Sequence, residues 1–155
     1  MQLSWLDAPE ATPACTVEDL QQVGVFYRHL STDAQAYEPA IAELCQRGGY
    51  TARDEVSLSA STPNLSTLLA KFKDEHLHDE DEVRFVLQGE GIFDLRSKDD
   101  RWMRAQVTAG DVLVVPRGLY HRFFLTDSCS IRCVRLFQDP TGWKPHYRHA
   151  AASPQ

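Results

Sequence analysis

The sequence predicts a mainly β protein, an antiparallel barrel or sandwich of the jelly-roll type, with N-terminal helices packed outside it. From Glu75 onward, short runs alternate apolar and polar residues with a period of two, and turn residues separate the runs. Before Glu75, apolar residues recur at helical spacing. A length of 155 residues suits one domain. We therefore expect a single domain over 1–155, with a lead-in over 1–74, a barrel core over 75–137 and a tail over 138–155.

Composition narrows the class of protein. The chain is 43% hydrophobic and 25% charged, as globular proteins are, and its net charge of -6 is spread along the chain. A nucleic-acid surface would need a clustered basic patch, so none is expected. No apolar run reaches membrane-spanning length, and the N-terminus lacks the pattern of a secretory signal. We expect a cytoplasmic monomer whose four cysteines are reduced and mostly structural.

Five elements are expected before Glu75. They are an edge strand at Leu3–Leu6, helices at Val17–Leu30 and Pro39–Gln46, a short strand at Glu55–Ser59, and a third helix starting at Asn64 or Ser66. Thr16 suits the N-cap of the first helix, although Gly24 weakens that helix. Pro39 would lie in the first turn of the second helix, and Gly48-Gly49 would end it. The third helix would bury a stripe of Leu65, Leu68, Leu69 and Phe72.

The barrel core is expected to hold six strands separated by turns. The strands are predicted at Val83–Gln88, Gly91–Leu95, Trp102–Val107, Asp111–Val115, His121–Leu125 and Ser130–Phe137. Glycine and acidic pairs such as Glu90-Gly91 and Asp127-Ser128 supply the turns. The residues after Phe137 are expected to form a loop that wraps the barrel.

The segment from His76 to Glu82 carries a candidate metal site. His76 and His78 are two residues apart, so on an extended strand both imidazoles point to one side. Glu82 follows after a possible bend and offers a carboxylate. Two imidazole nitrogens and one oxygen suit a divalent transition metal such as iron, nickel, manganese or zinc. The alternative is a solvated acidic turn that contains two histidines.

A second segment supports the prediction of a metal site. A buried apolar strand leads to Pro116 and Gly118, and then to His121 at the start of the next strand. Alone, His121 would more often be a hydrogen-bonded turn residue. With the first segment it completes a set of three imidazoles and one carboxylate. That set would leave two open positions on an octahedral ion, which suit a bidentate substrate or a substrate and dioxygen.

Together the two segments resemble the cupin superfamily. Its first motif, H-x-H followed by a glutamate and a glycine, is met by His76, His78, Glu82 and Gly89, and its second, ending P-x-G-x-x-H, is met by Gly110, Pro116, Gly118 and His121. A glycine usual before the first histidine is replaced by Ala70, and an asparagine frequent after the last by Leu125. Neither departure touches a ligand.

Within the cupins, the chain resembles the acireductone dioxygenase family. The resemblance rests on Glu75–Arg96, on Pro116–Phe123 and on Val134–Trp143, and it is weakest over 48–66 and after Arg148. It implies an oxygenase of methionine salvage that acts on an acireductone, an enediol with a methylthio side chain, and on dioxygen. With iron(II) the family yields formate and 2-keto-4-methylthiobutyrate. With nickel(II) relatives give formate, carbon monoxide and 3-methylthiopropionate, and the ligand set does not choose between the metals.

The resemblance also implies roles for further residues. The candidates are Arg84, Asp81 and Arg135 as catalytic groups, and Phe85, Phe123 and Trp143 as walls of the substrate pocket. A guanidinium at Arg84 would balance the enediolate charge, and Asp81 would handle a proton. The alternatives are a surface arginine paired with an acid, an exposed acid in an acidic run, and aromatic residues that simply fill the core.

Two other functions stay open at this point. One is a different metal-dependent cupin dioxygenase or isomerase, and the other is a non-catalytic cupin that binds a small ligand. Cupins host many functions, so the fold alone does not separate these readings.

Overall fold

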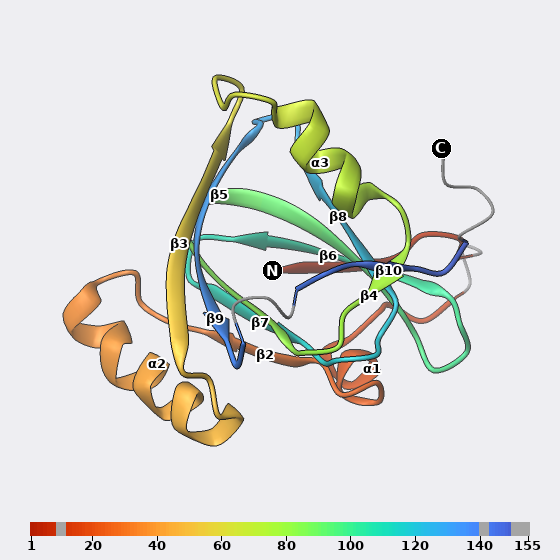
Figure 1. Ribbon diagram of the computed structural model, residues 1–155. Helices are drawn as coiled ribbons and strands as arrows, with labels where there is room; N and C mark the ends of the chain where they lie inside the picture. The colour runs from red at the N-terminus through yellow and green to blue at the C-terminus, as the bar shows by residue number, and fades with distance from the viewer. Residues whose placement is uncertain (9–11, 140–142, 150–155) are drawn as a thin grey trace.

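The computed structural model describes residues 1–8, 12–139 and 143–149, in which ten antiparallel strands and three helices form the mainly β, jelly-roll fold expected (Figure 1). In chain order the elements are β1 Gln2–Trp5, α1 Val17–Gln21, β2 Phe26–His29, α2 Ala34–Gly48, β3 Ala52–Ser59, α3 Leu65–Lys73, β4 His76–Leu77, β5 Glu82–Arg96, β6 Trp102–Thr108, β7 Asp111–Val115, β8 His121–Leu125, β9 Ser130–Phe137 and β10 His146–Tyr147.

Strand β5 organises the sheet because it belongs to both halves of it. Its first part, from Glu82 to Gly89, pairs with β7 and β9, and β9 pairs in turn with β3. Its second part, from Glu90 to Arg96, pairs with β6 and β8. The sequence analysis expected two strands here with a turn at Glu90-Gly91, and that expectation was wrong. The register instead shifts between Val86 and Gln88, and the strand continues as one.

Two apolar clusters stabilise the fold, one inside the barrel and one outside. The inner cluster includes Phe93, Leu95, Met103 and Phe123, all buried between the two halves of the sheet. The outer cluster joins Tyr37 and Ile41 of α2 to alternate residues of β5, β7 and β9, namely Val83, Phe85, Leu87, Val112, Val114, Val134 and Leu136. Helix α2 therefore packs on the outer face of β5, β7 and β9, and Figure 1 shows it outside the sheet.

The prediction of a helix over Val17–Leu30 is wrong for most of its length. Helix α1 ends at Gln21, and the chain then turns at Gly24, whose φ of 83° a helix does not allow. Phe26–His29 instead forms β2, which pairs with β7 through Phe26 and Val114. The apolar spacing that predicted a helix was satisfied by a strand, because β7 offered an unpaired edge that the local sequence does not reveal.

The other elements differ from prediction mainly at their ends. Helix α2 starts at Ala34, with the Asp33 carboxylate accepting from the Gln35 amide, so Pro39 lies inside the helix rather than in its first turn. Helix α3 begins after Asn64 as expected, and its apolar stripe is half-buried. Strands β7, β8 and β9 have the predicted bounds. No helix of the described segments is long and apolar enough to cross a membrane.

A substitution at Gly89 tests whether β5 needs a glycine to continue as one strand past its register shift. The φ of Gly89 is 78°, and a Cβ there would collide with the backbone carbonyl of Ser130 on β9. We expect Gly89→Ala to lower the free energy of unfolding by roughly 3 kcal/mol, because backbone strain and the collision add. The matched control is Gly49→Ala, which also has positive φ but no atom within 4 Å of the new Cβ, and which should cost roughly 1 kcal/mol. Equal losses in urea titrations of the two variants would contradict this account of the β5 bulge.

Candidate metal centre

Three buried imidazoles meet at the end of the barrel where β4 and β8 pair. His76 on β4 and His121 on β8 are direct cross-strand partners, and His78 lies just beyond β4. The ring centroid of His76 lies 4.6 Å from that of His121 and 4.9 Å from that of His78. One ligand nitrogen from each of the three lies within 4.8 Å of the others. The sequence-predicted histidines are therefore brought together.

The orientation of each ring is set by a hydrogen bond to the backbone. The Nδ1 atoms of His76, His78 and His121 lie 2.7, 3.1 and 2.8 Å from the carbonyl oxygens of Asp74, Lys144 and Leu119. A carbonyl only accepts, so each Nδ1 carries the proton and donates. Each Nε2 is then left to present its lone pair to the common point, as metal-binding histidines do.

Two of the Nε2 atoms have no hydrogen-bond partner in the part of the chain that the structure describes. These are Nε2 of His76 and of His121, which are buried with their residues at 0% and 1% exposure. Burial, with the neighbouring His121 contributing, lowers the pKa of His76 to about 4, so this ring stays neutral. A buried acceptor without a donor is costly unless something else fills the position. The pair therefore fits a bound cation.

Glu82 adds a carboxylate at the same point. It begins β5, is 2% exposed, and places Oε1 3.2 Å from Nε2 of His78 and 3.8 Å from Nε2 of His121. Burial opposes its ionisation, but Arg84 and the two histidines outweigh burial and hold the pKa of Glu82 well below its usual range. Burial also opposes protonation of His78, but the hydrogen bond and charge of Glu82, together with the Lys144 carbonyl, outweigh burial and raise that pKa. Three imidazoles and an ionised carboxylate fit a divalent transition metal, which would replace the proton at His78.

Arg84 lies beside this set with its side chain inside the barrel. Its Nε is 3.7 Å from Oε2 of Glu82, and its Nη1 donates to Sγ of Cys133 at 3.5 Å. The centre of the guanidinium lies 5.6 Å from the ring of Phe123 and 5.1 Å from that of Trp143. Burial would lower the pKa of Arg84, but Glu82, Cys133 and Asp54 together outweigh burial and raise that pKa, so the charge is retained.

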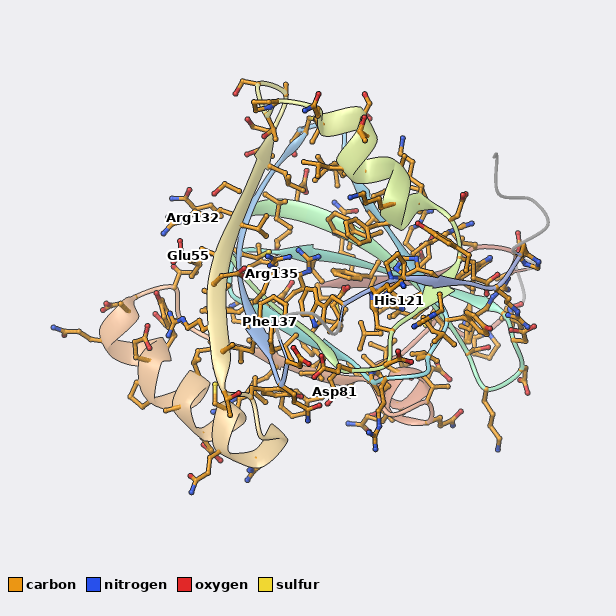
Figure 2. The ribbon with its side chains drawn as sticks, in the orientation of Figure 1. Glu55, Asp81, His121, Arg132, Arg135 and Phe137 are labelled. Carbon is orange, nitrogen blue, oxygen red and sulfur yellow. The ribbon has the colours of Figure 1, made fainter. Side chains whose placement is uncertain are left out.

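Arg135 lies directly opposite Arg84 in the β5–β9 register. It faces the interior from β9, beside Phe137, whereas Arg132 and Glu55 lie on the outer side of the sheet (Figure 2). Its guanidinium forms two hydrogen bonds of 2.8 and 2.6 Å with Asp54 of β3. Two like charges facing each other on neighbouring strands repel, so this pair suits an anion between them.

A cavity of about 260 Å³ lies next to these arginines. Arg84, Arg135 and Phe123 line it together with residues of α3 and β3, which are Val56, Leu58, Leu68, Leu69, Lys71 and Phe72. The ring of Phe72 is 5.9 Å from that of His76, so the cavity adjoins the histidines. It therefore combines apolar walls with cationic groups beside the candidate metal site.

Trp143 covers the centre from the C-terminal side. Its indole stacks on His78 at 6.3 Å, and its Nε1 donates to the main-chain oxygen of Asp81 at 3.1 Å. Of the two aromatic residues predicted as pocket walls, Phe123 lines the cavity, whereas Trp143 lies against His78 and Arg84 and is not among the lining residues.

Phe85 is a correction to the predicted site. It is fully buried in the outer cluster, with its ring 5.0 Å from that of Tyr37 of α2. Arg84 faces the interior, so the period of two along β5 turns Phe85 to the outer face. The sequence already contained this information, because Phe85 directly follows Arg84 on one strand and the two must face opposite sides. The aromatic ring of Phe85 favoured the prediction of a pocket wall instead.

Asp81 lies close to the site, but the hydrogen bonds of its carboxylate go to residues outside the site. Its carboxylate accepts hydrogen bonds from the hydroxyl of Tyr50 at 2.8 Å and from the amide of Arg117 at 3.0 Å. Figure 2 shows Asp81 apart from both His121 and Arg135. The carboxylate of Asp81 therefore links Tyr50 to the turn at Arg117, and its main-chain oxygen accepts the hydrogen bond from Trp143.

Three residues beside the centre were not singled out from the sequence. Cys133 contacts Arg84, Phe72 lines the cavity, and Tyr147 places its ring 6.0 Å from that of His76. Two of them could have been found from sequence patterns. Phe72 belongs to the apolar stripe predicted for the third helix, and the period of two along β9 places Cys133 on the same face as Arg135. No pattern in the tail indicated Tyr147.

Comparisons with known proteins agree with this geometry. The model of the ARD/ARD' family matches residues 7–145. An acireductone dioxygenase of Heterostelium pallidum is 41% identical over 140 residues, which are 90% of this chain and 94% of that protein. One of Sulfurihydrogenibium sp. is 48% identical over 113 residues, covering 73% of this chain and 63% of the relative.

A solved structure is similar over nearly the whole chain. It is an acireductone dioxygenase from Bacillus anthracis with a cadmium ion in its active centre, 31% identical, with a TM-score of 0.86 over 94% of this chain and 97% of that one. The histidine cluster of the present chain and the cadmium in that relative together support a divalent metal. This chain therefore belongs to the ARD/ARD' family of acireductone dioxygenases, which confirms the cupin-type fold and the enzyme class expected from its sequence.

Proposed function

We propose that the protein is a metal-dependent acireductone dioxygenase in which His76, His78, Glu82 and His121 hold one iron(II) or nickel(II) ion per chain. The observation that carries the proposal is the convergence of three buried imidazoles, each with Nδ1 committed to a carbonyl, beside a buried ionised carboxylate. When bound, the ion supplies a Lewis acid at which the enediolate oxygens and dioxygen meet.

The charges of the chain favour an anionic substrate. Arg84 and Arg135 carry two positive charges, and Glu82 and Asp54 carry two negative ones, so these four groups sum to zero. A divalent ion would raise the local sum to +2. An enediolate would offset that charge, and the donors of Arg84 would orient it through charge-assisted hydrogen bonds. Arg84 therefore binds and orients the substrate, and Arg135 supports it from β9.

The apolar walls account for the other end of the substrate. Leu58, Leu69 and Phe72 face the cavity from β3 and α3, opposite the arginines. A methylthio chain needs apolar surroundings and no hydrogen bonds, which these side chains offer. Phe123 and Trp143 lie against the guanidinium of Arg84, whose side chain is 7% exposed, and a position shielded from water strengthens its electrostatic interactions. The cavity thus matches a small molecule that is anionic at one end and apolar at the other.

Asp81 enters the proposal in a supporting role. Its main-chain oxygen holds the indole of Trp143, and its carboxylate holds the turn at Arg117. Direct proton handling by Asp81 stays a prediction of the sequence, as do the monomeric state, the cytoplasmic location and the extent of the single domain.

The proposal is tested by oxygen consumption with an acireductone, on metal-free protein reloaded separately with iron(II) and nickel(II). We expect formate and 2-keto-4-methylthiobutyrate with iron, and formate, carbon monoxide and 3-methylthiopropionate with nickel, because the same ligands suit both ions. The products are separated and identified by mass spectrometry. Consumption no faster than the spontaneous oxidation of the substrate with either metal would reject the proposed activity.

His121→Ala tests the ligand set. We expect the variant to lose at least nine-tenths of the metal found per chain in the unaltered protein, because His121 supplies one of the convergent nitrogens. Metal content is measured by elemental analysis after gel filtration. The control is His29→Ala, whose histidine lies opposite Asp111 at the far end of β7 from the residue that pairs with Glu82. Full metal content in His121→Ala would disprove the four-ligand assignment.

Arg84→Gln separates substrate binding from metal binding. The variant should keep its metal and lose about 100-fold in kcat/KM, because a charge-assisted contact to the substrate is removed. Arg132→Gln is a matched control, since this arginine also lies on the β5–β9 sheet and pairs with Glu55 on the outer face. The steady-state rates of both variants are compared at equal metal content. A similar loss in Arg132→Gln, or none in Arg84→Gln, would remove Arg84 from the site.

A further inference from the structure

The C-terminal strap, which we define as residues 143–149, forms part of the candidate metal centre although it lies far from it in sequence. Its Lys144 carbonyl accepts the hydrogen bond from Nδ1 of His78 at 3.1 Å. Its short strand β10 pairs with β4, with Tyr147 opposite His76. The strap therefore touches two of the three histidines and sets the ring orientation of one.

The end of the strap is held by an ionic latch, which we define as Glu75, Arg96, Asp100 and Arg148. The Arg148 guanidinium donates to Oε2 of Glu75 at 2.9 Å and to the two carboxylate oxygens of Asp100 at 2.8 and 3.0 Å. Arg96 donates to Glu75 from the barrel side at 2.7 and 3.0 Å. The amide of Arg148 also donates to the carbonyl of Glu75 at 3.1 Å.

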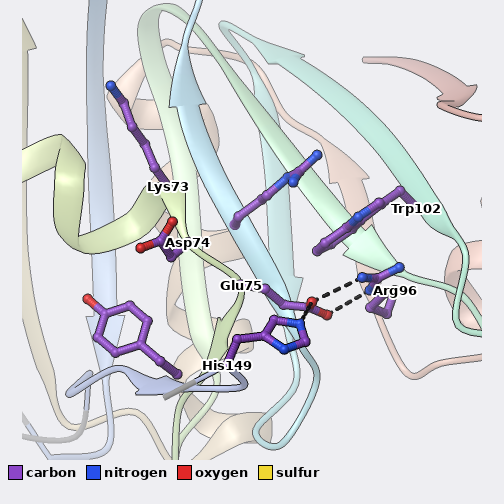
Figure 3. Close-up of a pocket in the computed structure, with 8 residues that line it drawn as sticks. Lys73, Asp74, Glu75, Arg96, Trp102 and His149 are labelled. Atoms are coloured by element: carbon purple, nitrogen blue, oxygen red, sulfur yellow. Dashed lines mark hydrogen bonds and ion pairs between the residues drawn. The ribbon is translucent and has the colours of Figure 1, made fainter. Parts of the chain in front are cut away.

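Glu75 is the centre of the latch. It directly precedes His76, and its side chain is only 6% exposed although it carries a charge. Burial opposes its ionisation, but Arg96 and Arg148 outweigh burial and lower the pKa of Glu75. Figure 3 shows its carboxylate between Arg96 and His149 of the strap, on the wall of an outer pocket of about 380 Å³.

We infer that Arg148 is a positioning residue for the metal centre: by latching the strap to Glu75 and Asp100, it keeps the Lys144 carbonyl on His78 and so controls how long the bound ion is retained. The inference rests on the proposed metal centre. It adds to that proposal a residue on the outer surface that touches neither ion nor substrate.

The arrangement explains why an outer ion pair matters here. Isolated surface ion pairs contribute little to stability, because solvent screens them. Arg148 instead joins two acids, one of them buried, and only four positions separate it from the carbonyl that orients His78. Besides the latch, the strap is restrained by the pairing of β10 with β4, by the backbone hydrogen bond from the amide of Arg148, and by side-chain hydrogen bonds of Trp143, His146 and Tyr147. Of these restraints, the latch is the one that joins the end of the strap to two acids. A metal ligand that loses its outer hydrogen bond typically binds 10 to 100 times more weakly.

The experiment measures nickel release and backbone exchange in the full chain. Nickel(II)-loaded protein is mixed with excess chelator, and the release rate is followed by absorbance. We expect Arg148→Gln to release nickel roughly tenfold faster, and Arg148→Lys, which keeps the charge, to lie between it and the unaltered protein. Hydrogen exchange of the metal-free protein should become faster in residues 143–149 of Arg148→Gln and stay unchanged in β6 and β9.

Two controls separate the outcomes. Arg53→Gln breaks an ion pair of the same kind, in which Arg53 donates to both oxygens of Glu38 at 2.8 Å, away from the strap. Asp100→Asn weakens the latch without changing Glu75 and should also speed release, so the inference does not depend on one variant folding.

Equal release rates in the unaltered protein, Arg148→Gln and Asp100→Asn would overturn the inference, as would a similar acceleration in Arg53→Gln. If the unaltered protein retains no nickel, the proposed metal centre fails instead. The exchange measurement on the metal-free chain then still decides whether Arg148 holds the strap.

Discussion

Three hydrogen bonds from imidazole Nδ1 atoms to main-chain carbonyls are the constraint on which the site depends. The carbonyls belong to Asp74 after α3, Leu119 before β8 and Lys144 in the strap. Each bond fixes a tautomer and aims one Nε2 at a shared point. Because the three acceptors come from separate parts of the chain, the centre is complete only when helix, barrel and strap are all in place.

The electrostatics of the interior follow from that centre. Buried charges are costly unless they are paired, and the chain pairs Arg84 with Glu82 in the interior. Arg135 pairs with Asp54 at a partly exposed position, where pairing matters less. The paired groups are neutral in sum, so the fold tolerates them. A cation bound at the histidines would change that balance and make the adjoining cavity attractive to an anion. In the proposed function, the same four side chains that pair with one another in the folded chain would also favour a charged substrate.

The long strand β5 couples these features to the barrel. Its register places Glu82 at the histidines and Arg84 opposite Arg135, and its second half carries the inner cluster. Its alternation also sends Phe85 outward to α2, which anchors the outer layer. A shift of one residue would exchange the two faces and remove both arginine and carboxylate from the interior.

The strands of the barrel and the four proposed ligands were predictable because their signals are local. Period-two alternation and the turn residues located β7, β8 and β9 at their observed bounds. The strand β2 was not predictable in the same way, since its apolar spacing suits a helix equally well and only the edge of β7 decides the matter. The continuity of β5 through Gly89 likewise depends on a distant partner, because Gly89 pairs with Ile131 of β9.

The fold class, the histidine and carboxylate set, and Arg84 as their neighbour could all be predicted from the amino-acid sequence, because residue type and spacing along one strand carry that information. The contacts of Asp81 with Tyr50, of Cys133 with Arg84 and of Arg148 with Glu75 appear only in the folded chain. These pairs join residues between 31 and 73 positions apart. Local periodicity describes which way a side chain faces, but the partner it meets is set by how distant elements pack.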